Sequence, residues 1–170
     1  MIDLKLFLRI VDSISMWSGK LFSFLVWPMI LVIACEIIAR YFFNFPTVWA
    51  SETVTYLCGI YAVVGGAYTL RFRGHVNVDI IYARLSTRKK ATVDLVTSLF
   101  FFFFFGVLLW TGFELGWESI EIWETSGTAW SPPIYPVKLI VPLAAVLMLF
   151  QGVADFIRNL RRALTGEKER

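Results

Sequence analysis

Few side chains in this chain could do chemistry, and they are far apart. His75 is the single histidine among the 170 residues, and the two cysteines, Cys35 and Cys58, form no CxxC pair. A haem held by two histidines needs a second histidine, and a zinc site needs a cluster of ligands. No Gly-rich phosphate loop precedes a helix, and no Ser, His and Asp set lies at a plausible depth. The pattern therefore predicts no catalysis, no metal and no cofactor.

The remaining candidates are charged and aromatic residues at helical spacing. Glu36 and Arg40 are four positions apart, and Trp49 and Glu52 follow them closely. Four positions are one helical turn, so Arg40 is expected to pair with Glu36 or with Glu52 across to the next helix. We expect this ion pair mainly to help two helices fold together at a membrane surface. The alternative is that it also positions the connecting loop for a partner protein.

Composition indicates the solvent in which such residues must be positioned. The chain is 58% hydrophobic and only 17% charged, with a mean hydropathy of +0.68. That leaves too little polar surface to wrap a water-soluble core of this size. A hydrocarbon layer about 30 Å thick is crossed by about 20 mostly apolar helical residues. A membrane span in this chain must therefore be an apolar stretch of about that length.

Four such stretches occur, and they predict an all-α integral membrane protein with one domain over residues 1–170. Residues 53–70 and 95–113 carry no charge, and 100–105 are six consecutive phenylalanines. Strands are excluded, because an open sheet edge in lipid would leave backbone groups without hydrogen bonds. The predicted spans are about 21–41, 52–70, 93–114 and 133–155.

Two further segments have the pattern of amphipathic surface helices. Residues 1–19 repeat apolar side chains at helical spacing while Asp12 and other charges face elsewhere, although this helix could also continue into the first span. Residues 76–86 form a second short piece after a break at Gly74. We expect His75 and Asp79 to cap and turn this helix, with a proton relay as the less favoured alternative.

Basic and acidic residues fall on opposite sides of these spans. The segments before span one, between spans two and three and after span four carry nearly all of the Lys and Arg, and only Arg40 and Lys138 lie opposite. Basic residues near span ends stay in the cytoplasm, so both termini and the middle loop are expected there. The pI near 9.0 then reports topology and not nucleic-acid binding. The opposite side carries Glu36, Glu52, Glu114, Glu118, Glu121 and Glu124.

Three of these acidic residues share one helical face. Glu114, Glu118 and Glu121 are spaced so that span three would continue beyond the membrane as a charged stalk. A stalk of this kind could contact a partner protein on that side of the membrane, with an ordinary solvated face as the alternative. A lipoprotein-like sequence ends at Cys35, but the apolar run continues past it, so no cleavage is expected.

Taken together, these motifs resemble the small membrane subunit (DctQ-like) of the tripartite ATP-independent periplasmic (TRAP) transporters, over roughly residues 10–160. The resemblance includes an Arg that ends the first span, a Trp-x-x-Glu that opens the second, a Gly-rich second span, an Arg-x-Gly-His-x-x-x-Asp turn and a Pro-rich entry to the fourth. The residues concerned are Arg40, Trp49, Glu52, Gly65, Gly66, Arg73, Gly74, His75, Asp79, Trp130, Pro132, Pro133, Pro136 and Lys138.

The resemblance implies a division of labour in a bacterial inner membrane. A periplasmic substrate-binding protein captures an organic anion such as a carboxylate and docks transiently, and we expect the stalk of Glu114, Glu118 and Glu121 to contribute to that docking. A large TRAP membrane subunit then moves the anion with a sodium gradient, and the small subunit stiffens the stationary part. The residues agree with this reading, because the spans lack the midplane polar groups that substrates and ions need. Gly65 and Gly66 would permit close helix packing, either within this chain or against the large subunit.

Two other classes of protein remain as alternatives. A stand-alone four-helix transporter or channel is expected to show an acidic residue near the middle of a span. A membrane anchor subunit of an oxidoreductase is expected to show haem ligands. Neither feature is evident in the sequence.

Overall fold

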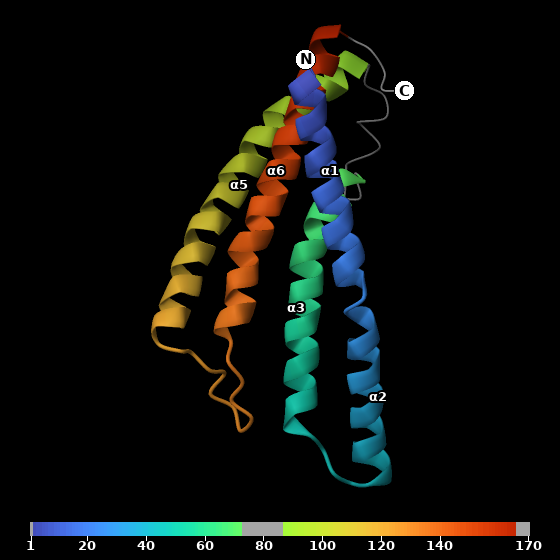
Figure 1. The fold of residues 1–170 in the computed structure, drawn as a ribbon, viewed down its shortest axis with the longest axis vertical. Coiled ribbons are helices and arrows are strands. Elements are labelled where there is room, and N and C mark those ends of the chain that lie inside the picture. Colours follow the sequence, from blue (N-terminus) through green and yellow to red (C-terminus); the bar gives the residue numbers. More distant parts are fainter. Residues whose placement is uncertain (1, 73–86, 166–170) are drawn as a thin grey trace.

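The part of the chain that the structure describes consists mainly of long helices. The computed structural model describes residues 2–72 and 87–165. Within these ranges all regular elements are helices, which confirms the predicted all-α class. Figure 1 shows their order, and the labels below follow it. The helices are α1 (Ile2–Ser23), α2 (Val26–Phe42), α3 (Val48–Arg71), α5 (Thr87–Glu121) and α6 (Tyr135–Thr165).

Four helical stretches are long and apolar enough to cross a membrane, as the sequence predicted. They are Leu6–Phe42, Val48–Arg71, Lys89–Glu121 and Tyr135–Thr165. The first has 37 residues because α1 and α2 follow each other with only a two-residue break. The helix predicted at residues 1–19 is thus α1, which leads directly into α2.

The break between α1 and α2 has a local cause. Pro28 has no amide hydrogen, so it cannot donate to the carbonyl of Phe24 four residues earlier. The backbone amide of Trp27 donates to that carbonyl instead, at 3.2 Å. Leu25 likewise donates to the carbonyl three residues before it, at 3.0 Å. These tighter turns interrupt the α-helical pattern and separate α1 from α2.

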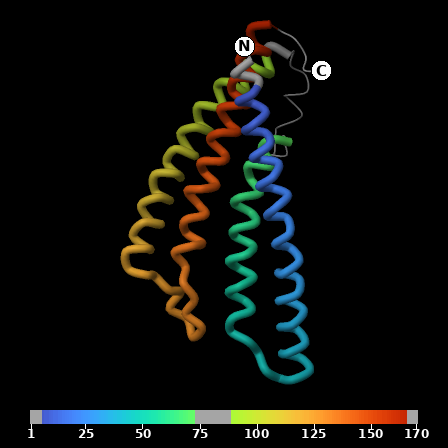
Figure 2. The backbone as a smooth tube through the Cα atoms, in the orientation of Figure 1, coloured from blue at the N-terminus to red at the C-terminus, as the bar shows by residue number. Residues whose placement is uncertain are grey.

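The helices form two arms that meet at one end. The α5–α6 hairpin makes one arm and α2 with α3 makes the other, and the arms diverge toward their loops (Figures 1 and 2). Helix α6 contacts α5, α3 and α1, and α1 also packs on α3. The core is therefore a seam along α6, where the buried residues are Pro142, Ala144, Ala145, Met148, Gln151, Gly152 and Ala154.

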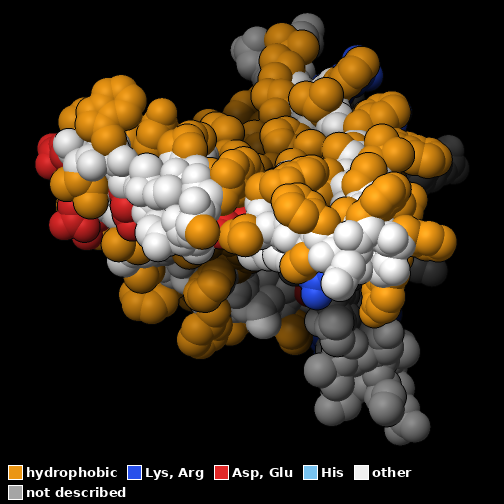
Figure 3. All heavy atoms as spheres, turned by 90° about the horizontal axis from the view of Figure 1, so that it is seen from below, with side chains coloured by type: hydrophobic (Ala, Val, Ile, Leu, Met, Phe, Trp, Pro, Cys, Tyr) orange, Lys and Arg blue, Asp and Glu red, His pale blue; other side chains and the backbone are white. Residues whose placement is uncertain are grey.

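The chain leaves an unusually large surface uncovered. Its accessible area is 11971 Å², whereas a compact soluble protein of 19.5 kDa exposes about 8,500 Å². None of α2 is buried, and its side chains Trp27, Ile30 and Leu31 are each more than half exposed. Hydrophobic side chains likewise cover most of the face in Figure 3. A contiguous apolar surface of this size is rare on proteins that are surrounded by water, and it is typical of a surface that faces lipid or another protein.

Candidate functional site: polar clusters at the two ends of the helices

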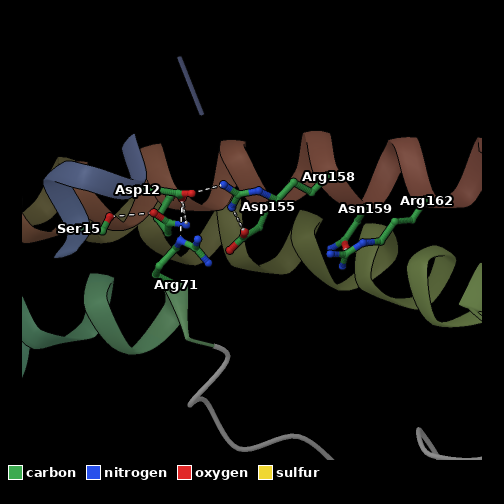
Figure 4. Close-up of polar contacts among 8 residues, drawn as sticks. Asp12, Ser15, Arg71, Asp155, Arg158, Asn159 and Arg162 are labelled. Atoms are coloured by element: carbon green, nitrogen blue, oxygen red, sulfur yellow. Dashed lines mark hydrogen bonds and ion pairs between the residues drawn. The ribbon is translucent and has the colours of Figure 1, made fainter. Parts of the chain in front are cut away.

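At the end of the molecule where the chain begins, a carboxylate joins three helices (Figure 4). The carboxylate of Asp12 of α1 lies 2.9 Å from Nε of Arg71 of α3, and it accepts a hydrogen bond from Nη2 of Arg158 of α6 at 2.6 Å. Arg158 also binds Asp155 through Nη1 at 2.7 Å. The Arg71 Nε hydrogen is not aligned as a hydrogen bond, so that contact is one of charge. Two negative and two positive groups therefore balance each other here.

A pair of neutral side chains extends this network into the core. Ser15 donates a hydrogen bond to Oε1 of Gln151 at 2.8 Å, and Nε2 of Gln151 lies 3.4 Å from Asp12. Both Ser15 and Gln151 are almost completely buried. A polar group that is buried among apolar side chains needs a hydrogen-bond partner, and Ser15 and Gln151 provide one for each other. We call Asp12, Ser15, Arg71, Gln151, Asp155 and Arg158 the Asp12 cluster.

Sequence reasoning missed the Asp12 cluster. Asp12 was assigned to the outward face of an amphipathic helix, but it lies against α3 and α6 with its side chain 18% exposed. A signal was present: Gln151 interrupts the apolar fourth span, and Asp155 and Arg158 follow at helical spacing. A buried amide in a span indicates an interhelical hydrogen bond.

At the opposite end, Glu36 closes the connection between α2 and α3. Its Oε1 accepts Arg40 Nη2 at 2.5 Å, and its Oε2 accepts both the hydroxyl and the backbone amide of Thr47, the latter at 3.1 Å. Thr47 directly precedes α3. Asn44, in the loop between α2 and α3, adopts a positive φ of 49°. Of the two partners expected for Arg40, the structure places Glu36 beside it. The contacts of Glu36 with Arg40 and Thr47 therefore fix the position at which α3 begins.

Glu52 makes a different contact from the one considered for it. Its Oε2 accepts a hydrogen bond from Ser126 at 3.2 Å, which joins α3 to the loop between α5 and α6. Trp49, one turn earlier, is 41% exposed, and Trp130 in the loop is 46% exposed. Both tryptophans lie at this end of the helices, where an amphipathic ring suits a membrane interface.

The loop between α5 and α6 is held by its own ion pair. Lys138 of α6 forms an ion pair with Glu124. An isolated antiparallel β-bridge joins Thr125 to Pro133. The hydrogen bond from Lys138 is the main reason that the pKa of Glu124 lies below its ordinary value. The loop residues that precede α6 are thereby tied to the end of α5.

This ion pair predicts a pH dependence of stability. A lowered carboxylate pKa contributes stability above the ordinary value of 4.5, and that contribution is lost as the pH falls through the folded-state pKa. Lys138→Met is therefore expected to lower the melting temperature at neutral pH, with a gap from wild type that shrinks below pH 4.5. In a Glu124→Gln background the same substitution should matter little at any acidic pH. A gap that persists unchanged at low pH would contradict this role.

Helix α5 carries the acidic face foreseen in the sequence. It continues through Glu121, and Glu114, Glu118 and Glu121 are exposed along it. Acidic side chains gather at the left of Figure 3, over this end of α5. Trp117 donates its indole hydrogen to Oε1 of Glu121 at 2.7 Å.

The two neighbouring glycines of α3 have different surroundings. A Cβ at Gly66 would lie 3.3 Å from Sδ of Met148 in α6, so this glycine serves packing within the chain. A Cβ at Gly65 would meet nothing within 4 Å. The remaining motif residues, Arg73, His75 and Asp79, lie outside the described residues, as does the helix predicted at 76–86.

The described residues gather no three His, Cys, Asp or Glu side chains that could hold a metal ion. What the polar groups do is join helices at the two ends. No curated protein matches this sequence. The family model for the DctQ component of the tripartite ATP-independent periplasmic transporters matches residues 29–162, which is most of the chain. The matched region runs from the start of α2 to the last turns of α6. The chain therefore belongs to the DctQ family, the small membrane component of these transporters.

Proposed function

We propose that this chain is the stationary scaffold subunit of a sodium-coupled TRAP transporter for organic anions such as carboxylates. In this proposal the large subunit carries the substrate and ion sites, and the small subunit carries neither. The observation that supports it is the placement of charge. The charged side chains lie outside 53–70 and 95–113, the central parts of the second and third spans. Sodium or a carboxylate at mid-depth would need polar partners there.

A support must also be rigid and must have a surface to offer. The Asp12 cluster ties α1, α3 and α6 together, and the Glu52 contact ties the two arms at their far end. The uncovered apolar faces of α2 and α5 provide area for a larger membrane protein. A moving subunit needs a fixed neighbour. A chain whose helices are joined by polar contacts at both ends can serve as one.

We further propose that the basic end faces the cytoplasm and that the acidic stalk on α5 helps to dock the periplasmic protein. The exposed Glu114, Glu118 and Glu121 support the second point, since they offer negative charge at the end opposite the termini. A cysteine in place of exposed Glu118 should react with an impermeant reagent added outside the cell. Labelling only from the cytoplasmic side would reverse the orientation.

Reconstitution tests the scaffold proposal. Liposomes with the small subunit alone are expected to show no sodium-driven uptake of an organic anion. Adding the large subunit and the binding protein should restore uptake, and omitting only the small subunit should abolish or cripple it. Reversing all three stalk charges in the full system should lower uptake and change its salt dependence. Sodium-driven uptake by this chain alone would overturn the proposal and favour a stand-alone transporter.

A further inference from the structure

A hollow opens between α1 and α3, next to the break that separates α1 from α2. It has a volume of about 390 Å³. Two glycines create it: Gly19 allows α1 to approach the ring of Tyr68, and Gly65 leaves open space where another residue would project a side chain. The lining residues are Gly19, Lys20, Ser23, Tyr61, Ala62, Gly65, Tyr68 and Thr69. We call this hollow the Lys20 groove.

Lys20 places a cation beside this groove, directly before the first predicted span. Lys20 is eight residues beyond Asp12 on α1, which puts it about 12 Å farther from the basic end than the Asp12 cluster. A cation at this depth is costly unless an anion accompanies it or its side chain extends to the headgroups. Among the described residues Lys20 forms no ion pair. Lys20 is exposed, so its side chain can extend to the headgroups, where the phosphate of a lipid can balance its charge.

The size of the Lys20 groove limits what can enter it. The groove follows α3 from Tyr61 to Thr69, a length of about 12 Å. A helix segment of that length with its side chains occupies about 1,000 Å³, far more than the groove offers. A whole helix can only pack across this groove, whereas a single flexible chain fits inside it. In a bilayer, the molecule that combines a flexible apolar chain with an anionic group is a phospholipid.

We propose that the Lys20 groove binds one anionic phospholipid. An acyl chain fills the space beside Ala62 and Gly65, and the phosphate pairs with the ammonium of Lys20. Tyr61 and Tyr68 line the same groove, and their hydroxyls make no hydrogen bond with a described residue. They provide further donors for the ester and phosphate oxygens. Bound lipid would also contact Ser23 at the end of α1 and stabilise the break between α1 and α2.

The test measures lipid retained by the full chain purified with the large subunit in detergent. Phosphatidylglycerol and the zwitterionic phosphatidylcholine are supplied at equal concentration, and retention is read by native mass spectrometry. Wild type is expected to retain phosphatidylglycerol preferentially. Lys20→Met should reduce that retention at least fivefold, Lys20→Arg should preserve it, and Gly65→Leu should reduce it by filling the groove. Lys89→Met, which removes an exposed cation from α5, is the matched control and should behave as wild type.

Several results would overturn the proposal. Equal retention of the two lipids by wild type would remove the anionic headgroup from the argument. Equal retention by wild type and Lys20→Met would remove the pairing with Lys20. If both Lys20→Met and Gly65→Leu keep the lipid but lose the large subunit, the groove is a protein contact instead. Melting curves recorded without added lipid show whether each variant is folded, so that a loss of lipid is not mistaken for a loss of structure.

Discussion

Asp12→Ala is expected to destabilise the chain by about 3 kcal/mol and to release α1 from α3 and α6. Removing one partner of a buried ion pair leaves the others uncompensated, which typically costs about 3–5 kcal/mol. The lower end applies here because Asp12 is 18% exposed and Arg71 is 38% exposed. Without Asp12, two arginines face the single carboxylate of Asp155. The measurement is thermal unfolding in detergent, with protease accessibility of residues 2–23 as a readout of α1 detachment.

A charge-balanced double variant separates this electrostatic effect from general damage. Asp12→Leu combined with Arg71→Leu removes one charge of each sign and leaves Arg158 paired with Asp155. Apolar replacement of a buried pair is often neutral, so the double variant should recover most of the lost stability. If the double variant is as unstable as Asp12→Ala, charge balance is not what holds α1 in place.

Gly19→Ala is expected to be the most damaging single-methyl change in the transmembrane part of the chain. A Cβ at this position would lie 2.4 Å from Cγ and 2.5 Å from Cβ of Tyr68. Because these atoms are close to the backbone of α3, rotating the tyrosine ring cannot relieve the overlap, and α1 must move away. Overpacking of this kind costs about 1–3 kcal/mol. Thermal unfolding of the purified variant measures the loss.

The matched control is a glycine with free space around it. A Cβ at Gly59 of α3 would meet nothing within 4 Å. Alanine also favours the helix over glycine by about 0.5–1 kcal/mol, so Gly59→Ala should be neutral or slightly stabilising. Equal losses for the two variants would mean that the contact with Tyr68 does not control the result, because a Cβ at Gly59 meets no neighbour.

The sequence by itself determined the four spans and the placement of charge at their ends. Length and apolar character are enough to identify a membrane helix, since lipid requires each span to satisfy its own backbone hydrogen bonds. Glu36 and Arg40 were predictable as a pair for a similar reason. Their spacing of one helical turn is a local property that any helix would reproduce.

Only the tertiary structure decided which polar side chains meet across helices. Asp12 and Arg158 are 146 positions apart, and Ser15 and Gln151 are 136 apart. An amphipathic pattern tells which residues share a face, but it cannot tell whether that face meets water, lipid or another helix. Asp12 was therefore assigned to the surface, whereas a neighbouring pair of arginines holds it between helices.

The same limit applies to the glycines and to Lys20. Gly65 and Gly66 are equivalent in a sequence motif, yet they point about 100° apart around α3, so one packs on Met148 and the other faces an open groove. In the sequence Lys20 is one of several cations beside a span. The structure shows that Gly19 and Gly65 line a groove beside it. Local propensity determines the helices, whereas the rotation of each helix against its neighbours is set by the packing of the whole assembly.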